Sequence, residues 1–230
     1  MTRQTRLVEV RQQVLKQNDV VARALRTRFR GAGVYVVSLV SSPGSGKTAF
    51  LEKTLTMLRE EFRVAALVGD LATDNDARRL ARSEVPVKQI TTGTLCHLEA
   101  EMVRTALDGW NEGELDYLFI ENVGNLVCPA TFDLGEDLRL VLFSTTEGED
   151  KPLKYPTIFN TADVAVITKI DLADAVEFNR AAAHQNIQSV RPGMEIIEVS
   201  SKSGQGMNEF LDFLRSRRLE ARPQAKAAAR

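Results

Sequence analysis

The chain has 230 residues, of which 43% are hydrophobic, and this length is enough for one large α/β domain. Its 30 basic and 31 acidic residues almost cancel, which argues against nucleic acid or another polyanion as a partner. No run approaches the length of a membrane span, the N-terminus lacks the apolar core of a secretory signal, and two cysteines make no disulfide framework. We therefore expect a cytoplasmic protein with neither a membrane nor a nucleic-acid partner.

Residues 1–33 are predicted to form a basic amphipathic helix that precedes the main domain. Its first 30 residues carry eight basic and two acidic side chains. The apolar residues recur near helical spacing: Leu7, Val10, Val14, Val21 and Leu25. Such a helix can dock on an acidic partner or a phosphate backbone, or it can pack on the domain with a solvated basic face. We favour packing, because Phe29 is the one aromatic residue here that could stack on a base.

Residues 34–216 alternate between strand-like and helix-like stretches, which predicts an α/β fold with a mostly parallel twisted sheet and helices on both faces. The expected strands cover residues 34–40, 64–69, 86–90, 116–121, 138–143, 163–168 and 195–199. The expected helices cover residues 47–61, 73–83, 97–110, 173–190 and 206–216. Binding loops then lie at the carboxyl ends of the strands. Residues 217–230 hold Pro223 in a mixture of Ala, Lys and Arg and are expected to be disordered.

Residues 41–48 read Ser-Ser-Pro-Gly-Ser-Gly-Lys-Thr and lie between an expected strand and an expected helix. This context predicts the phosphate-binding loop of a P-loop NTPase rather than a Gly/Ser-rich connector. Backbone N–H groups at the helix start bind phosphate oxygens, the Lys47 ammonium reaches the β- and γ-phosphates, and the Thr48 hydroxyl ligates Mg²⁺. Ser41 stands where the first glycine of the motif is usual. The predicted nucleotide contacts are Gly44, Ser45, Gly46, Lys47, Thr48 and Ala49.

Two later segments predict that the nucleotide is GTP or GDP. Residues 168–171 (Thr-Lys-Ile-Asp) follow an expected strand, and the Asp171 carboxylate can accept the two hydrogen bonds that guanine donates. Thr168 replaces the usual Asn of this motif but keeps a hydroxyl. Residues 200–202 (Ser-Ser-Lys) follow the last expected strand, where GTPases place a loop that backs the guanine. Each segment alone would be an ordinary turn, but their order after the phosphate loop favours base recognition. The predicted base contacts are Thr168, Lys169, Asp171, Ser200, Ser201 and Lys202.

Two carboxylates at strand ends are candidates for the hydrolytic machinery. Asp70 follows the strand at 64–69, and Glu121 ends the strand at 116–121 with Gly124 three residues later. We expect both carboxylates to hold Mg²⁺ with Thr48, with orientation of the attacking water as a second role for Asp70, and the Gly124 N–H to sense the γ-phosphate. Surface carboxylates that cap loops are the alternative. Phosphoryl transfer depends more on positioning and charge neutralisation than on a base. The predicted catalytic residues are therefore Lys47, Asp70 and Glu121, with slow turnover.

The two cysteines and one histidine form a second constellation. Cys96 and His97 are adjacent, and Cys128 lies seven residues after Glu121. Two thiolates and an imidazole suit nickel or zinc. From spacing alone, two buried thiols and a loop histidine are the commoner arrangement, and His184 is expected at the surface. Three ligands do not close a structural site, but a symmetric dimer can bring two such sets together.

Five motifs recur together along the chain: SPGSGKT at 42–48, GD at 69–70, TG-x-x-CHL at 92–98, ENVGNLVCP at 121–129 and SGQGM at 203–207. Over about residues 34–214 they resemble the HypB family, SIMIBI-class P-loop GTPases that help insert nickel into [NiFe]-hydrogenase. The resemblance implies a GTPase, a nucleotide- or metal-dependent homodimer, and metal binding by Cys96, His97 and Cys128. It also implies two partners, a HypA-type nickel accessory protein and the hydrogenase large-subunit precursor.

Other functions share parts of this pattern. A urease metallochaperone GTPase typically carries Cys-Pro-His, whereas Cys96 and His97 are contiguous here. A GTPase chaperone for a cobalamin-dependent mutase would not need this Cys/His set, and a P-loop small-molecule kinase would phosphorylate an acceptor rather than water. In a non-catalytic module the cysteines would hold structural zinc, and metal removal would unfold the protein. Residues 1–33 contain neither Cys nor His, so we expect no nickel-storage motif there.

Overall fold

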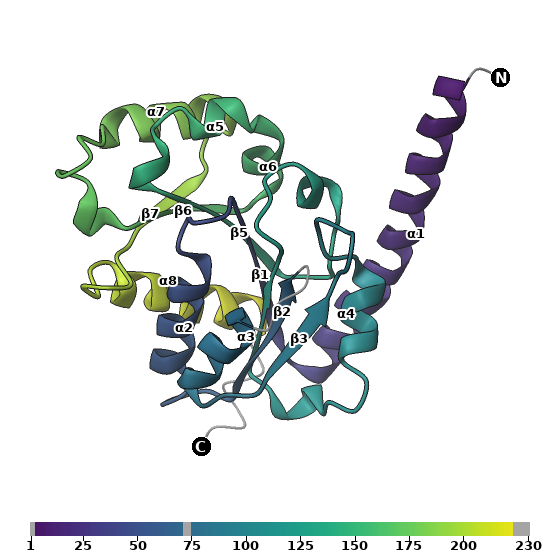
Figure 1. Ribbon diagram of the computed structural model, residues 1–230. Helices are drawn as coiled ribbons and strands as arrows, with labels where there is room; N and C mark the ends of the chain where they lie inside the picture. The colour runs from purple at the N-terminus through teal and green to yellow at the C-terminus, as the bar shows by residue number, and fades with distance from the viewer. Residues whose placement is uncertain (1–2, 71–74, 223–230) are drawn as a thin grey trace.

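The computed structural model describes residues 3–70 and 75–222, with the side chains of the first helix described from residue 12 onward. The strands are β1 (Tyr35–Ser41), β2 (Val64–Asp70), β3 (Val87–Thr91), β4 (Tyr117–Glu121), β5 (Leu138–Ser144), β6 (Val164–Thr168) and β7 (Glu195–Glu198). They form one parallel sheet in the order β3-β2-β4-β1-β5-β6-β7 (Figure 1). The predicted parallel α/β architecture is confirmed.

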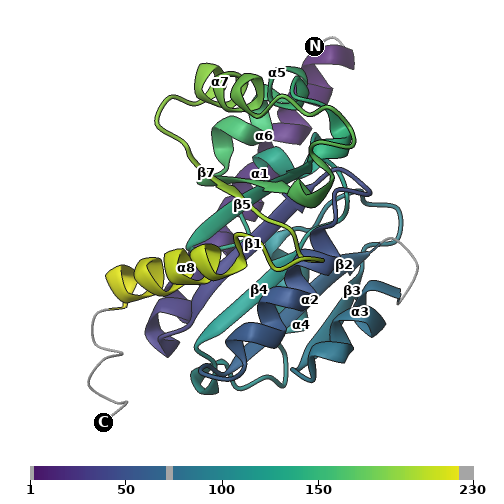
Figure 2. The ribbon, with the colours of Figure 1, turned by 90° about the vertical axis from the view of Figure 1, so that its left-hand side faces the viewer.

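Helices cover both faces of this sheet. They are α1 (Arg3–Ala32), α2 (Lys47–Leu58), α3 (Asn75–Leu80), α4 (Ala100–Ala106), α5 (Lys151–Lys154), α6 (Pro156–Thr161), α7 (Arg180–Val190) and α8 (Met207–Ala221). Helices α2, α3 and α8 pack on one face, and α1, α4, α6 and α7 pack on the other (Figure 2). Short 3₁₀ turns join them: η1 (Ala81–Ser83), η2 (Glu112–Glu114), η3 (Cys128–Thr131), η4 (Thr145–Glu147) and η5 (Ile170–Leu172).

The central strand β1 shows why this sequence forms a buried parallel sheet. All seven of its residues are buried, and its side chains alternate between the two faces. Val37 and Leu39 pack with α2 and α8, whereas Val36 packs with α1 and α4 on the opposite face. Strand β1 lies between β4 and β5, so its carboxyl end delivers the phosphate loop to the middle of the sheet edge.

Helix α1 packs on the domain through its C-terminal half. Ala22, Leu25 and Phe29 are buried against α4 and the sheet, and Arg28 pairs with Glu112 at 2.6 Å. The N-terminal half extends beyond the sheet (Figure 1). The prediction of a packed helix is therefore confirmed for this half; the expected core positions Leu7 and Val10 lie outside the described side chains.

Several helix boundaries differ from the expected ones for local reasons. Helix α7 begins at Arg180 rather than 173, because Glu177 adopts a positive φ of 53° and Asn179 caps the helix by accepting the Ala182 N–H. Helix α4 is shorter than the expected 97–110. Helices α5 and α6 were not expected. Each has a proline in its first turn, a position where a helix tolerates proline because the missing N–H would have no partner within the helix.

The expected disorder from residue 217 is wrong for residues 217–221, which continue α8. Arg218 explains this extension, because its guanidinium pairs with Asp116 at 2.5 Å and lies over the rings of Phe62 and Tyr117. Residues 223–230, and positions 73–74 of an expected helix, lie outside the described residues. Within residues 3–70 and 75–222, no helix combines the length and the apolar character that crossing a membrane requires.

Candidate functional site

The phosphate loop forms a cradle between β1 and α2. Gly44 and Gly46 have positive φ values of 78° and 90°, which glycine adopts without strain, and α2 begins directly after Gly46. A cavity of about 550 Å³ opens above the loop. It is lined by residues 41–49 together with Asp70, Asp76, Arg79, Val123, Gly124 and Lys169. Among these lining residues, Arg79 is a cation that no sequence motif pointed to.

Ser41, in place of the usual glycine, fits this loop without backbone strain. It is the last residue of β1 and is fully buried, and its hydroxyl donates to the Ser42 carbonyl at 2.9 Å. The left-handed positions of the loop are Gly44 and Gly46, so position 41 does not require a glycine. The Ser42 hydroxyl donates in turn to Glu147, which ties the loop to η4.

Glu121 lies behind the cradle and holds two of its side chains. Its carboxylate is fully buried, and Oε1 lies 2.5 Å from Lys47 Nζ and 2.6 Å from Thr48 Oγ1. Its other oxygen, Oε2, has no hydrogen-bond partner within the part of the chain that the structure describes. The register between β1 and β4 creates this arrangement, because it pairs Leu39 with Glu121 just before the phosphate loop.

These residues fit a magnesium ion. The Thr48 hydroxyl and the carboxylates of Asp70 and Glu121 are the oxygen ligands that Mg²⁺ prefers, and a buried, unpartnered carboxylate oxygen is suited to a cation. Asp70 ends β2 and lines the phosphate cavity. Glu121 ends β4 and lies below the phosphate loop, where its carboxylate contacts Lys47 and Thr48. The three expected Mg²⁺ residues therefore meet at the same edge of the sheet.

A second cavity of about 210 Å³ adjoins the first and brings the predicted base contacts together. Its lining residues are Gly46, Ala49, Thr168, Lys169, Asp171, Leu172, Ser200, Ser201 and Lys202. Gly46, Ala49 and Lys169 line both cavities, so the two spaces lie side by side along the phosphate loop. One cavity therefore lies over the phosphate loop and the other beside Asp171, an arrangement that suits the phosphates and the base of a nucleotide.

Thr168 and Lys169 fasten the base loop to the phosphate loop. The Thr168 hydroxyl donates to the Ser45 carbonyl at 2.5 Å, and Lys169 Nζ donates to the Gly44 carbonyl at 2.7 Å. Thr168 is buried, so its hydroxyl holds the two loops together in place of the usual Asn. The Asp171 carboxylate accepts the Ser200 hydroxyl at 2.6 Å through Oδ1, which fixes its orientation beside the cavity.

Cys96, His97 and Cys128 form a compact cluster of soft ligands. Their ligand atoms all lie within 4.8 Å of one another. The two Sγ atoms are 2.7 Å apart, and Cys96 Sγ lies 3.9 Å from His97 Nδ1. The ring of His97 packs on Phe132 with centroids 4.0 Å apart. Three donors in this spacing can bind one transition-metal ion and leave further coordination positions for other ligands.

The protein environment perturbs both Cys96 and His97. The hydrogen bond with the Cys128 thiol raises the pKa of Cys96, and burial raises it further. Burial lowers the pKa of His97, although the nearby Glu99 carboxylate partly opposes this effect. A lowered histidine pKa keeps the imidazole neutral, which is the form that binds metals. Metal binding must displace the thiol protons, because the thiolate is the ligand form.

Two asparagines that the sequence analysis assigned no role connect the metal cluster to the nucleotide cavity. Asn122 directly follows Glu121, and its Oδ1 accepts the N–H groups of Leu98 and Val123 at 3.0 and 2.9 Å. Asn125 donates to the Cys96 carbonyl at 3.4 Å. Both lie in the motif at 121–129, but their contacts depend on long-range pairing that a linear pattern does not reveal.

Comparison with known proteins fits this geometry. A sequence profile described as "CobW/HypB/UreG, nucleotide-binding domain" matches residues 35–198. The hydrogenase maturation factor HypB of Azotobacter vinelandii is 46% identical over 225 residues, covering 96% of this chain and 74% of that protein. The chain belongs to the HypB family. The Escherichia coli K12 HypB is 43% identical, with 94% of this chain and 74% of that protein covered.

Solved HypB structures share most of this fold. The HypB structure from Helicobacter pylori in complex with nickel superposes with a TM-score of 0.85 at 40% identity, covering 90% of this chain and 97% of that chain. The HypB structure from Archaeoglobus fulgidus has a TM-score of 0.81 at 38% identity, covering 87% of this chain and 98% of that chain. The resemblance of the motifs to the HypB family, and the P-loop nucleotide-binding fold that it implies, are confirmed.

Proposed function

We propose that this chain is a GTP-hydrolysing metallochaperone that binds nickel and assists its insertion into [NiFe]-hydrogenase. The observation that carries the proposal is the Cys96–His97–Cys128 cluster, which is attached through Asn122 to the end of the nucleotide cavity. Relatives at 46% and 43% identity are named hydrogenase maturation factors, and a HypB structure was solved with nickel. One chain thus holds a nucleotide site beside a set of ligands suited to nickel.

The nucleotide is GTP, and Asp171 reads its base. A carboxylate accepts both donors of guanine, and the Ser200 hydroxyl fixes Asp171 through Oδ1. The backbone N–H groups of Gly44 to Ala49 hold the phosphates, and Lys47 supplies a positive charge. Magnesium, held by Thr48 with Asp70 and Glu121, supplies charge neutralisation on the phosphate oxygens. Lys47 must then exchange its contact with Glu121 for a phosphate oxygen.

Hydrolysis relies on positioning rather than on a strong base. Asp70 lines the phosphate cavity and orients the attacking water, while Glu121 holds Mg²⁺ with Thr48 once Lys47 has moved to a phosphate oxygen. The Gly124 backbone N–H senses the γ-phosphate, a role supported by the place of Gly124 in the cavity lining and its close approach to Pro43. Without a further arginine supplied to the transition state, turnover is slow.

Nickel is the cargo of the Cys/His cluster. Cys96 and Cys128 bind it as thiolates and His97 binds it through a ring nitrogen. Further ligands come from a second copy of the chain in a nucleotide- or metal-dependent homodimer, or from a protein that exchanges the ion. Val127 is 65% exposed directly beside Cys128, so one apolar side chain next to the cluster is free to contact such a protein. A HypA-type nickel accessory protein and the hydrogenase large-subunit precursor are the proposed exchange partners.

A second recipient is supported by one relative. HypB of Helicobacter hepaticus, 41% identical with 93% of this chain and 89% of that protein covered, is named a hydrogenase/urease maturation factor. We therefore include urease maturation as the second candidate function. It uses the same nucleotide and nickel sites and differs only in the receiving protein.

The base-recognition step gives the first test. Phosphate release from GTP and from ATP is measured for the native chain and for Asp171→Asn, with equilibrium dialysis against Ni²⁺ in parallel. We expect GTP to be hydrolysed in preference to ATP and Asp171→Asn to lose that preference. In the dialysis we expect the variant Cys96→Ala to bind less Ni²⁺ than the native chain. Equal hydrolysis of ATP, or nickel binding that survives Cys96→Ala unchanged, would overturn the proposal.

A further inference from the structure

Helix α1 contacts both of the segments that carry the metal ligands. Cys96 and His97 lie four and three residues before Ala100, the first residue of α4, whereas Cys128 begins η3 and leads into residues 132–139. These segments are more than thirty residues apart in the chain, as the Cys96–Cys128 separation of 32 shows. Their relative position therefore depends on contacts between elements rather than on local chain geometry.

Asn18 of α1 contacts both segments with one side chain. Its Oδ1 accepts the Ala100 N–H at 2.8 Å, and its Nδ2 donates to the Asp133 carbonyl at 2.8 Å. Asn18 is 6% exposed, although amide side chains rarely lie in a core without polar partners. The Ala100 N–H is one of the first donors of α4 and has no partner within that helix, so Asn18 supplies the missing acceptor.

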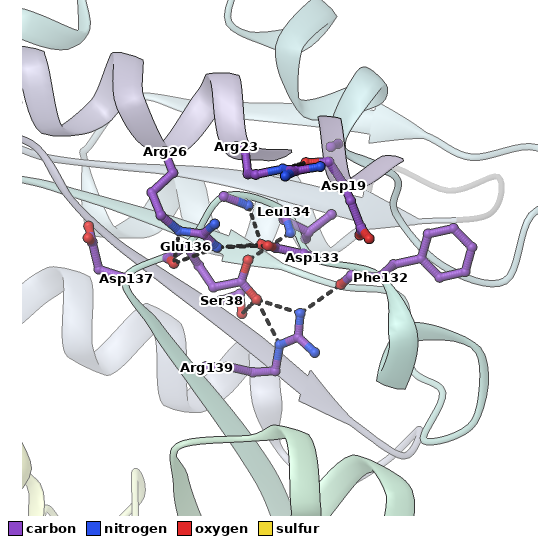
Figure 3. A network of polar contacts seen from close by, with 12 residues as sticks. Asp19, Arg23, Arg26, Ser38, Phe132, Asp133, Leu134, Glu136, Asp137 and Arg139 are labelled. Atoms are coloured by element: carbon purple, nitrogen blue, oxygen red, sulfur yellow. Dashed lines mark hydrogen bonds and ion pairs between the residues drawn. The ribbon is translucent and has the colours of Figure 1, made fainter. Parts of the chain in front are cut away.

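The second segment is itself held by a network of polar contacts. Arg139 donates to the Phe132 carbonyl at 2.7 Å and pairs with Glu136, which also accepts the Ser38 hydroxyl (Figure 3). Arg26 of α1 pairs with Asp133 at 2.6 Å in the same network (Figure 3). Since the Phe132 ring packs on His97, this network reaches the metal cluster directly.

We propose that Asn18 is a positioning residue for the nickel site, fixing the Cys96–His97 segment relative to the Cys128 segment. The inference rests on the proposed nickel function and gives α1 a role in it. Asn18 contacts neither the ligands nor the nucleotide cavity; it acts through Ala100 on one side and Asp133 on the other. Removing it takes away one of the attachments between the two ligand segments and leaves the hydrogen bonds of Asn122 and Asn125, which lowers nickel affinity without altering nucleotide binding.

Two Asn18 variants separate this role from general stability. Asn18→Leu keeps the volume and removes both hydrogen bonds. Asn18→Asp keeps the acceptor for Ala100 but places an oxygen against the Asp133 carbonyl. The matched control is Arg28→Gln, which removes a different attachment of α1, the pair with Glu112, far from the cluster in the chain. All three variants are made in the full chain and checked for folding by circular dichroism.

The experiment is a Ni²⁺ titration followed by the thiolate-to-nickel charge-transfer absorbance, with GDP affinity measured beside it. Removal of groups that orient metal ligands lowers metal affinity by about 10- to 100-fold, and we expect about tenfold for Asn18→Leu, less for Asn18→Asp, and less than twofold for Arg28→Gln. GDP affinity should stay within about twofold for every variant, which a general loss of structure would not allow.

The outcomes distinguish the inference from the proposed function. If the native chain binds Ni²⁺ through both cysteines but Asn18→Leu and Asn18→Asp bind it with native affinity and absorbance, the positioning role fails and the proposed function stands. If Arg28→Gln weakens nickel binding as much as Asn18→Leu, the effect belongs to α1 docking in general, and the specific role of Asn18 also fails. If the native chain shows no cysteine-dependent nickel binding, both fail together.

Discussion

The buried contact between Lys47 and Glu121 predicts a specific competition at the phosphate site. The side chain of Glu121 is 0% exposed and that of Lys47 is 9% exposed, with their charged atoms 2.5 Å apart. Bound phosphate needs the same ammonium group. Glu121→Gln removes the charge that competes for Lys47 and keeps the shape of the side chain. The variant should therefore be less stable alone but gain more stability from a nucleotide.

The size of the effect follows from burial. Removing one partner of a buried ion pair costs about 3–5 kcal/mol, because the remaining charge is left unpaired. We expect about 3 kcal/mol here, since Lys47 faces a cavity that admits water. For a chain of 230 residues this lowers Tm by about 6–12 °C.

Thermal unfolding in EDTA, which excludes Mg²⁺, measures the stability of the variant without GDP and the stabilisation that GDP adds. A ligand that binds the folded state more tightly raises Tm more at the same concentration. GDP should therefore raise the Tm of Glu121→Gln more than that of the native chain. The matched control is Glu112→Gln, which breaks the ion pair between another buried carboxylate and Arg28. GDP should raise the Tm of this control no more than that of the native chain. An equal or smaller GDP shift for Glu121→Gln would refute the competition.

Three further predictions follow from the site. Thr168→Val removes the hydroxyl that bonds the Ser45 carbonyl and should weaken GDP binding by about 1–3 kcal/mol in calorimetry, with little change for Ni²⁺. Gly124→Ala places a Cβ 3.2 Å from phosphate-loop backbone and should slow GTP hydrolysis, measured as phosphate release, more than it lowers Tm. Burial opposes ionisation of Asp133, but Arg26 and backbone contacts hold the pKa of this carboxyl below its ordinary value of about 4. The ionised carboxylate therefore stabilises the fold above that ordinary value, and this stabilisation is lost as the pH falls through the lower pKa of the folded state. In urea unfolding, Asp133→Asn should lower the free energy of unfolding at pH 7, and this loss should shrink toward pH 2.

Strands and local motifs could be predicted because their signals are local. A parallel strand buried on both faces reads as a nearly continuous apolar run, as in β1 and in residues 140–143 of β5, and the phosphate loop needs glycines at defined positions. Helix ends were less predictable, since they depend on side chains such as Asn179, which caps α7, and Arg218, which packs the end of α8 on aromatic rings.

Contacts between distant segments were not predictable from spacing. Lys47 meets Glu121 because β1 and β4 are neighbours, although the two residues are 74 positions apart. The Cys96–Cys128 cluster likewise depends on where two crossover loops end, and spacing alone favoured inert thiols. The contacts of Asn18 span 82 and 115 positions and left no mark in the linear pattern.

The central claim is that the nickel cluster and the nucleotide site act together through the segment from Glu121 to Cys128. The most direct test is a Ni²⁺ titration of the native chain, Cys96→Ala and Cys128→Ala, each with GDP and with a non-hydrolysable GTP analogue. We predict that both cysteines are required, that nickel affinity differs between the two nucleotide states, and that nickel changes nucleotide affinity by the same factor. Nickel binding that is indifferent to either cysteine, or equal in the two nucleotide states, would contradict the account.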